Sequence, residues 1–149
     1  HLMPFCIFSI PETEPLMPTA ALKQSGVTDE RKLAAPAMKG FFQIMERWDV
    51  DNDRARTLLG APPERTFYLW KAGQVSRVPM DTLRRIGYIA GIWKALQIIY
   101  SDPALANRWI KASNRALGGM TPLERMAAGD VTDLAAVRGY IDAARSPWS

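Results

Sequence analysis

The sequence predicts an all-α protein in which a helix-turn-helix unit precedes a small helical domain. Apolar residues recur at spacings of three and four from residue 37 onward, which is the period of an amphipathic helix. Residues that cap or stop helices, namely Gly, Pro, Asp, Asn and Thr, stand between these periodic segments. With 149 residues and 48% hydrophobic content, the chain is long enough to bury a core.

Three regions are expected along the chain. Residues 1–35 hold four prolines and little helical periodicity, so we expect an extended or partly ordered leader there. Residues 36–100 are expected to form a helix-turn-helix DNA-binding and dimerisation region, and residues 101–149 a C-terminal helical domain.

The positive charge is concentrated in the middle of the chain. Residues 31–120 carry fifteen Lys and Arg against seven Asp and Glu, a net charge of +8. Residues 1–30 carry a net charge of −3, and residues 121–149 a net charge of −1. A basic centre suits a polyanion such as nucleic acid, while a solvated surface of mixed charge is the alternative interpretation.

Composition argues against a secreted protein, a membrane protein and an enzyme. Cys6 is the one cysteine, which excludes an internal disulfide and indicates a reducing cytoplasm. The apolar run at residues 4–10 lacks a basic flank and soon meets Pro11, so we expect neither a signal peptide nor a membrane span. With one histidine, at position 1, and no Gly-rich phosphate loop, we expect no catalytic site, cofactor or metal.

The first helices are expected over residues 37–48 and 51–59. An apolar stripe marks the first as a core helix, and its members are Met38, Phe41, Phe42, Met45 and Trp48. Asp51, Asn52 or Asp53 is the expected N-cap of the second, which stops at Gly60.

A third short helix is expected over residues 64–73, after a tight turn that contains glycine. Two short helices around such a turn are the arrangement of a helix-turn-helix, whose second helix presents its N-terminal residues to the major groove. Arg can grip guanine, Glu can accept from cytosine, and Thr can meet a thymine methyl or a phosphate. The predicted DNA-binding residues are Glu64, Arg65, Thr66, Tyr68 and Lys71. A helical hairpin with solvent-facing polar residues is the alternative.

The longest periodic segment, residues 80–100, is expected to be the central helix, capped by Asp81 or Thr82. Its stripe consists of Leu83, Ile86, Ile89, Ile92, Trp93, Leu96, Ile99 and Tyr100. Gly87 and Gly91 leave room for the close approach of a neighbouring helix or a second subunit.

Three further helices are expected in the last third of the chain. The first opens with Asp102 as N-cap and Pro103, and runs to about residue 117 with Leu105, Trp109 and Ile110 on its buried side. The second covers residues 121–128 and opens with a capping box of Thr121 and Glu124. The third runs from Asp130 or Thr132 to about residue 145, and its apolar residues are Leu134, Val137, Tyr140 and Ile141.

Over residues 40–145 the sequence resembles the Xre/MbcA/ParS antitoxins. The run from Asn114 to Glu124, at its distance behind the helix-turn-helix, carries most of the resemblance. The matching pieces are Leu58-Leu59-Gly60, Arg65-Thr66-Phe67-Tyr68-Leu69-Trp70-Lys71-Ala72-Gly73, Asp102-Pro103, Trp109, Asn114-Arg115-Ala116-Leu117-Gly118-Gly119-Met120-Thr121-Pro122-Leu123-Glu124 and Gly129-Asp130. Met120 departs from the family pattern, which often has Arg or Lys there, and residues 1–35 lie outside the resemblance.

The resemblance implies a cytoplasmic bacterial type II antitoxin that is not an enzyme. Its implied partners are a RES-domain toxin that consumes NAD, operator DNA and a second copy of itself, with no membrane. Such an antitoxin blocks the active-site cleft of the toxin and represses its own operon. A helix-turn-helix transcription regulator without a toxin partner is the alternative.

The expected toxin contacts lie at the C-terminal end. Trp, Tyr and Arg are the commonest residues in binding hot spots, and four of them stand near the end of the chain. The predicted toxin-binding residues are Arg138, Tyr140, Arg145 and Trp148. Packing within the last helix is the alternative role for Tyr140.

Overall fold

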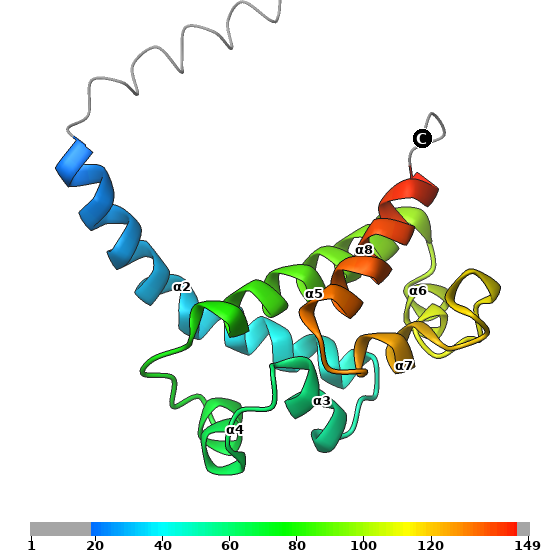
Figure 1. Ribbon diagram of the computed structural model, residues 1–149, viewed down its shortest axis with the longest axis horizontal. Coiled ribbons are helices and arrows are strands. Elements are labelled where there is room, and N and C mark those ends of the chain that lie inside the picture. The colour runs from blue at the N-terminus through cyan, green and yellow to red at the C-terminus, as the bar shows by residue number, and fades with distance from the viewer. Residues whose placement is uncertain (1–18, 146–149) are drawn as a thin grey trace, which may run out of the picture. The chain divides into compact units, whose positions relative to one another are not determined.

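The computed structural model describes the backbone of residues 19–145 and the side chains of residues 32–145. The predicted all-α class is confirmed, because residues 19–145 form seven α-helices and one short 3-10 helix, with no strand (Figure 1). The elements are α2 (Thr19–Arg47), α3 (Asn52–Leu58), α4 (Glu64–Lys71), α5 (Met80–Ile99), α6 (Pro103–Trp109), the 3-10 helix η2 (Arg115–Leu117), α7 (Pro122–Met126) and α8 (Val131–Arg145). None of the helices in this described part is long and apolar enough to cross a bilayer.

The extended leader expected through residue 35 is wrong for residues 19–35, which are the first part of α2. All four prolines that suggested an extended arm precede Thr19 in the sequence. Residues 19–35 are instead rich in Ala, Leu, Lys and Arg, which favour helix. The rest of the expected leader, residues 1–18, lies outside the described residues.

The chain divides into two compact units, residues 1–33 and residues 34–149. Within the second unit, α5 packs most extensively on α8 and also contacts α6, while α7 packs on α8. Figure 1 shows α5 and α8 side by side and running in the same direction. Ile89 and Ile92 of α5 share one buried cluster with Leu134 and Val137 of α8 and with α2, α3 and α4. The boundary expected at residue 100 therefore does not separate two hydrophobic cores.

Several predicted helix starts are confirmed, and one is wrong. Asp51 is the N-cap of α3, where its Oδ1 accepts from the Arg54 N–H at 2.8 Å. The helix α5 begins at Met80 behind Pro79, so neither Asp81 nor Thr82 caps it. Asp81 instead pairs with Arg85 one turn along the same helix, and Thr82 donates to the Leu59 carbonyl, a tertiary contact that is not visible in the local pattern.

The helix expected to reach residue 117 ends at Trp109. The short helix η2 follows, and Asn114 caps it, since Asn114 Oδ1 accepts from the Ala116 N–H at 2.9 Å. Ser113 Oγ donates to the Gly119 carbonyl at 2.6 Å and closes the same loop. Side chains on this segment form local hydrogen bonds that compete with continued helix, which explains the early stop.

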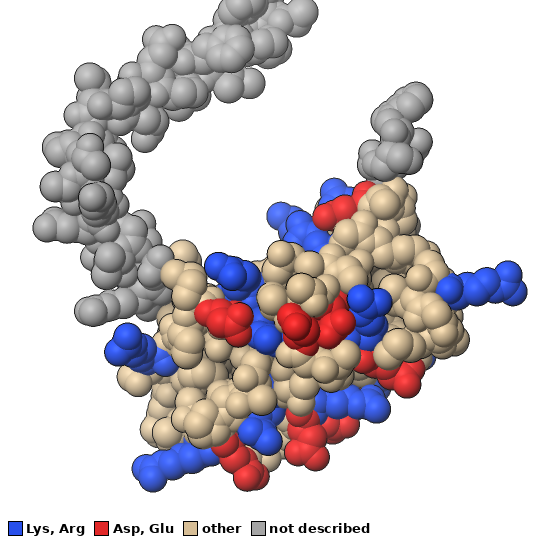
Figure 2. All heavy atoms as spheres, in the orientation of Figure 1, with Lys and Arg blue, Asp and Glu red and all other residues tan. Residues whose placement is uncertain are grey.

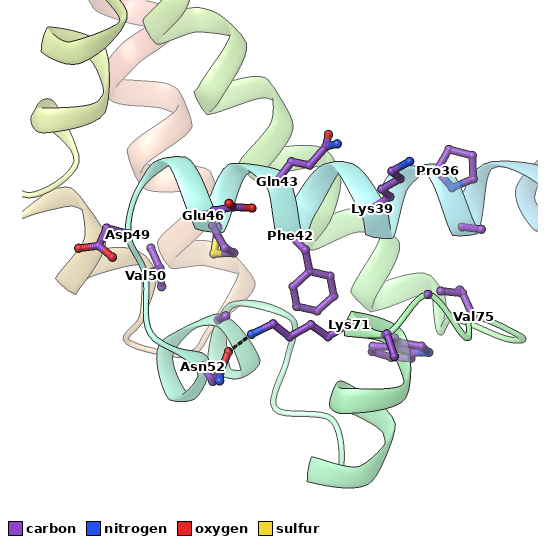
Figure 3. A pocket seen from close by; sticks show the side chains of 16 residues that line it. Pro36, Lys39, Phe42, Gln43, Glu46, Asp49, Val50, Asn52, Lys71 and Val75 are labelled. Carbon is purple, nitrogen blue, oxygen red and sulfur yellow. Dashed lines mark hydrogen bonds between the residues drawn. The ribbon is translucent and has the colours of Figure 1, made fainter.

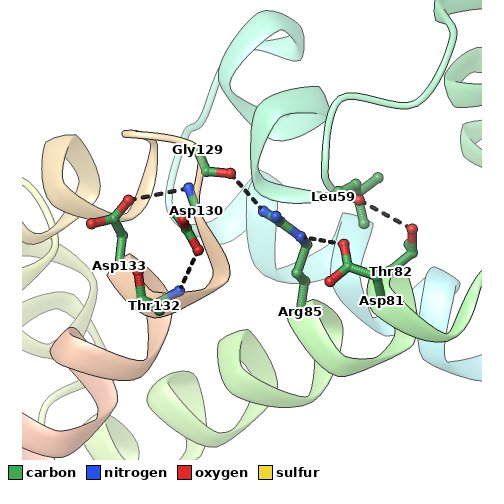
Figure 4. Close-up of polar contacts among 8 residues, drawn as sticks. All are labelled: Leu59, Asp81, Thr82, Arg85, Gly129, Asp130, Thr132 and Asp133. Carbon is green, nitrogen blue, oxygen red and sulfur yellow. Dashed lines mark hydrogen bonds and ion pairs between the residues drawn. The ribbon is translucent and has the colours of Figure 1, made fainter.

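A buried polar contact joins the start of α5 to two other segments (Figure 4). Arg85 is 8% exposed, pairs with Asp81 at 2.8 Å and donates to the Gly129 carbonyl at 3.1 Å. Thr82 Oγ1 donates to the Leu59 carbonyl at 3.2 Å. The first turns of α5 therefore hold both the end of α3 and the loop between α7 and α8.

Two helix-capping carboxylates are expected to make stability depend on acid pH. Glu124 accepts from the Thr121 N–H within the confirmed capping box, and this hydrogen bond lowers the pKa of Glu124 from 4.5. The Thr132 N–H likewise lowers the pKa of Asp130 from 3.8. A carboxylate whose pKa is lower in the folded state than in the unfolded state stabilises the fold at pH values above the unfolded-state pKa. This stabilisation is lost as the pH falls through the folded-state pKa.

We expect the free energy of unfolding to fall below about pH 4.5, and less steeply in the double variant Glu124→Gln, Asp130→Asn. Urea denaturation measured at several pH values between about 3 and 7 checks this expectation. The matched control is Asp49→Asn, at an exposed carboxylate outside these caps. Equal pH slopes for the wild type and the double variant would contradict the role given to the caps.

Candidate functional site

The turn between α3 and α4 is held in one conformation by its backbone and by Arg56. Gly60 and Ala61 both adopt left-handed backbone angles, with φ of 97° and 55°. A side chain at Gly60 would also approach Arg85 Nε at 3.1 Å, so glycine suits this position for two reasons. Arg56 Nη1 donates to the Pro62 carbonyl at 2.8 Å. These contacts give α4 a defined starting point relative to α3.

The helix α4 is anchored by its apolar side. Phe67 and Trp70 are buried, and the Phe67 ring meets Phe42 of α2 edge to face at 5.4 Å. Leu69, the residue before Trp70, is 38% exposed. The opposite side of α4 is thereby left facing outward on a firmly packed helix.

The structure places most of the predicted DNA-binding residues on this outward side. Glu64 and Arg65 are exposed at the N-terminal end of α4, Thr66 is half-buried, and Tyr68 is exposed. Lys71 is exposed at the other end, and its Nζ donates to Asn52 Oδ1 at 2.7 Å. Lys71 therefore also braces α4 against α3, a second role that the sequence did not indicate.

A groove of about 1010 Å³ lies beside Lys71 (Figure 3). Its walls come from α2 and from the end of α4 with the following turn, and Figure 3 shows Lys71 reaching along it toward Asn52. The lining residues are Ala35, Pro36, Lys39, Phe42, Gln43, Met45, Glu46, Asp49, Val50, Asn52, Ala55, Trp70, Lys71, Ala72, Gly73 and Val75. The sequence did not indicate this groove because α3 separates its two walls along the chain.

Charges of both signs occupy the surface. Figure 2 shows Lys and Arg interspersed with Asp and Glu on the face that it draws. The positive excess of residues 31–120 is thus not gathered into one patch on that face. Over the part of the chain that the structure describes, no cluster of three or more His, Cys, Asp or Glu side chains is placed to hold a metal ion.

The segment from Asn114 to Glu124 is a closed loop that leads into α7. The Asn114 N–H donates to the Met120 carbonyl at 3.0 Å, and the Gly119 N–H donates back to Asn114 at 2.9 Å. Gly118 and Gly119 have φ of 70° and 87°, which favours glycine at both positions. The Leu123 N–H donates to the Ile110 carbonyl at 2.9 Å. This motif therefore positions α7 against α6.

Two of the predicted toxin-binding residues make contacts within the fold. Arg138 lies across Gly91 of α5, where a side chain would collide with its guanidinium group, and pairs with Asp142 at 3.1 Å. Gly91 thus admits a side chain of α8, while Gly87 has open space around it. Tyr140 is 38% exposed and stacks on Trp109 with ring centroids 6.2 Å apart. Tyr140 therefore packs within the fold and still exposes part of its ring.

Comparison with known proteins connects the C-terminal part of the chain to a protein family. The family model described as the antitoxin Xre/MbcA/ParS C-terminal toxin-binding domain matches residues 95–146. Uncharacterized protein y4oB of Sinorhizobium fredii is 34% identical over 127 residues, which cover 85% of this chain and 98% of y4oB. The match over residues 95–146 supports an Xre/MbcA/ParS-type antitoxin. No solved structure matches the chain.

The matched segment of the antitoxin runs from the end of α5 through α6, α7 and α8. This match to a toxin-binding domain supports a role as the antitoxin of a toxin–antitoxin system. Arg138, Tyr140 and Arg145 lie within the matched segment, and Arg145 is exposed at the last position of α8. Trp148 lies outside both the matched and the described residues.

The antitoxin also exposes apolar residues that the sequence placed in the core. Leu105, expected on the buried side of its helix, is 43% exposed, and Ile99, expected in the core stripe, is 40% exposed. Ile98 beside it is 57% exposed. Helical spacing identifies one face of a helix but does not say whether another element covers that face along its whole length.

Proposed function

We propose that this antitoxin occludes the active site of a RES-domain toxin that degrades NAD, and that it represses its own operon as a cytoplasmic homodimer. The match of residues 95–146 to a toxin-binding domain carries the proposal. Occlusion requires a shaped surface and no reactive groups of its own, which suits the short helices and exposed side chains of this segment.

The toxin-facing side of the proposal rests on the end of α8. Tyr140 presents an exposed aromatic ring held rigid by its stack on Trp109, and Arg145 presents an exposed guanidinium group one turn later. Arg138 is oriented by Asp142. Side chains that are rigid before binding lose less conformational entropy on association, which favours Tyr140 and Arg138 as toxin contacts. Arg145 and Trp148 are proposed from residue type, since Arg and Trp are common in binding hot spots.

Co-expression with the neighbouring open reading frame tests the proposed partner. We expect cellular NAD to fall when the neighbouring gene is expressed alone and to stay at its normal level when this antitoxin is present. Unchanged NAD in the absence of the antitoxin would contradict a NAD-degrading partner. Co-purification of no second polypeptide would favour the alternative, a transcription regulator without a toxin partner.

The C-terminal tail is expected to contribute to neutralisation. Deleting residues 146–149, or changing Trp148 to Ala, should weaken toxin binding by about 2 kcal/mol or more, as loss of a hot-spot aromatic residue does. Survival of toxin-expressing cells and the affinity of the purified pair measure this effect. Ser149→Ala is the matched control in the same tail, and full rescue by the truncated form would remove the tail from the mechanism.

The DNA-facing side of the proposal rests on α4. Its outward residues Glu64 and Arg65 carry hydrogen-bonding groups suited to base edges, while Lys71 is placed for a phosphate. The buried contacts of Phe67 and Trp70 hold this helix firmly, as a helix that enters the major groove requires. A gel-shift assay with the promoter region of the operon tests whether the antitoxin binds DNA.

A further inference from the structure

Three exposed apolar residues lie where α5 leads into α6. Ile98 and Ile99 occupy the last turn of α5, and Leu105 occupies the first turn of α6. Their exposures of 57%, 40% and 43% are high for large aliphatic side chains, while Leu96 and Ile110 nearby are buried. We call these three residues the α5–α6 patch. Adjacent exposed apolar residues on a small domain commonly mark an interaction site.

The patch lies toward the same end of the helix pair α5 and α8 as the last residue of α8. Arg138 of α8 lies across Gly91 of α5, and the two helices run in the same direction (Figure 1). Because both helices rise equally per residue, Ile98 and Arg145, each seven residues further on, come level with one another. Ile98 of the patch therefore lies level with the end of α8.

Basic side chains accompany the patch. Lys94 precedes Ile98 by four residues and Arg108 follows Leu105 by three, which are the spacings of neighbours on one helix face. Both are exposed, and neither forms an ion pair within residues 32–145. A complementary partner surface is therefore apolar at its centre and acidic around it.

We infer that the α5–α6 patch is a docking surface for the toxin, where it binds an apolar surface with an acidic rim beside the mouth of the toxin's active site. This inference rests on the proposed function and adds an anchor outside the final helix and tail. The patch lies wholly within residues 95–146, the segment that matches a toxin-binding domain, as do the proposed toxin contacts Tyr140 and Arg145. The anchor holds the toxin while the tail blocks its cleft.

Binding of the purified RES-domain toxin from the neighbouring gene, measured by calorimetry with full-length antitoxin variants, tests the inference. Ile98→Asp and Leu105→Asp are expected to weaken affinity by about 30-fold or more, since each places a charge in an apolar contact. Met80→Asp is the matched control, because Met80 is 53% exposed at the opposite end of α5, and its affinity should stay within about 3-fold of the wild type. Circular dichroism confirms that each variant is folded.

The possible outcomes separate the inference from the proposed function. Binding by Ile98→Asp and Leu105→Asp that equals the Met80→Asp control overturns the docking surface and leaves the RES partner in place. Failure of the wild-type antitoxin to bind the toxin overturns the proposed partner and the docking surface together. A change from dimer to monomer in Ile98→Asp, measured by light scattering without toxin, assigns the patch to self-association and also overturns the inference.

Discussion

Replacing Arg65 and Thr66 with Ala is expected to abolish sequence-specific operator binding and to leave toxin neutralisation intact. Loss of one bidentate contact from Arg65 to a base costs about 1–3 kcal/mol, which is about 5- to 150-fold in affinity. The folded state should tolerate the change, because Arg65 is exposed and the helix is held by Phe67 and Trp70 on its other side. The effect is therefore assigned to lost contacts with DNA.

Gel-shift titrations at fixed salt concentration, with operator and unrelated DNA in parallel, measure this effect. Lys71→Ala should weaken binding to both DNAs alike and reduce the salt dependence, since a phosphate contact carries no sequence information. Arg115→Ala, at an exposed position of η2, is the matched control for the loss of one positive charge. If the double variant kept the wild-type preference for the operator, α4 would not be the reading helix.

Leu134→Ala is expected to destabilise the whole of the second unit by about 2–5 kcal/mol, the range for a buried leucine truncated to alanine. Leu134 is fully buried in α8, which packs on α5, and its truncation would leave a cavity in a closely packed core. Because one core joins α5 and α8 to α2, α3 and α4, the loss should lower the stability of the helix-turn-helix as well.

Thermal and urea unfolding, followed by circular dichroism and by tryptophan fluorescence, measure the expected loss of stability in Leu134→Ala. Tryptophan fluorescence reports on Trp48 and Trp70 in the N-terminal part of the core and on Trp93 and Trp109 packed against it. Both probes should therefore shift together in Leu134→Ala. The matched control is Leu105→Ala, the same truncation at an exposed site of α6, with an expected cost below about 0.5 kcal/mol. Separate transitions for the two probes would show that residues 36–100 and 101–149 unfold independently.

Local sequence patterns predicted much of the fold correctly. The caps at Asp51, Asp102 and Thr121 are confirmed, since each side chain accepts from a backbone N–H in the first turn of its helix. The stripe from Met38 to Trp48 is buried, with Phe42 half-buried at its edge. Capping and periodicity act over one to three turns, so a short stretch of sequence contains the whole signal.

Some errors came from local signals that were misread, and others arose where distant segments decide the outcome. The proline count of residues 1–35 concealed the helix from Thr19, and the apolar spacing after Pro103 concealed the early stop at Trp109. The predicted DNA-binding residues lie together on α4, yet the brace from Lys71 to Asn52 joins residues far apart in the chain. Ile99 and Leu105 of the α5–α6 patch were likewise interpreted as core from their spacing alone.

By itself, the sequence determined that this protein is all-α, where most of its helices start, and that it resembles an antitoxin family. Only the tertiary structure decided that one core joins both halves, that Arg138 packs across Gly91, and that the end of α5 stays uncovered. Helix formation and capping depend on residues within a few positions of one another. Burial depends on which elements pack together, so covered and exposed apolar positions are alike in the sequence and differ only in the folded protein.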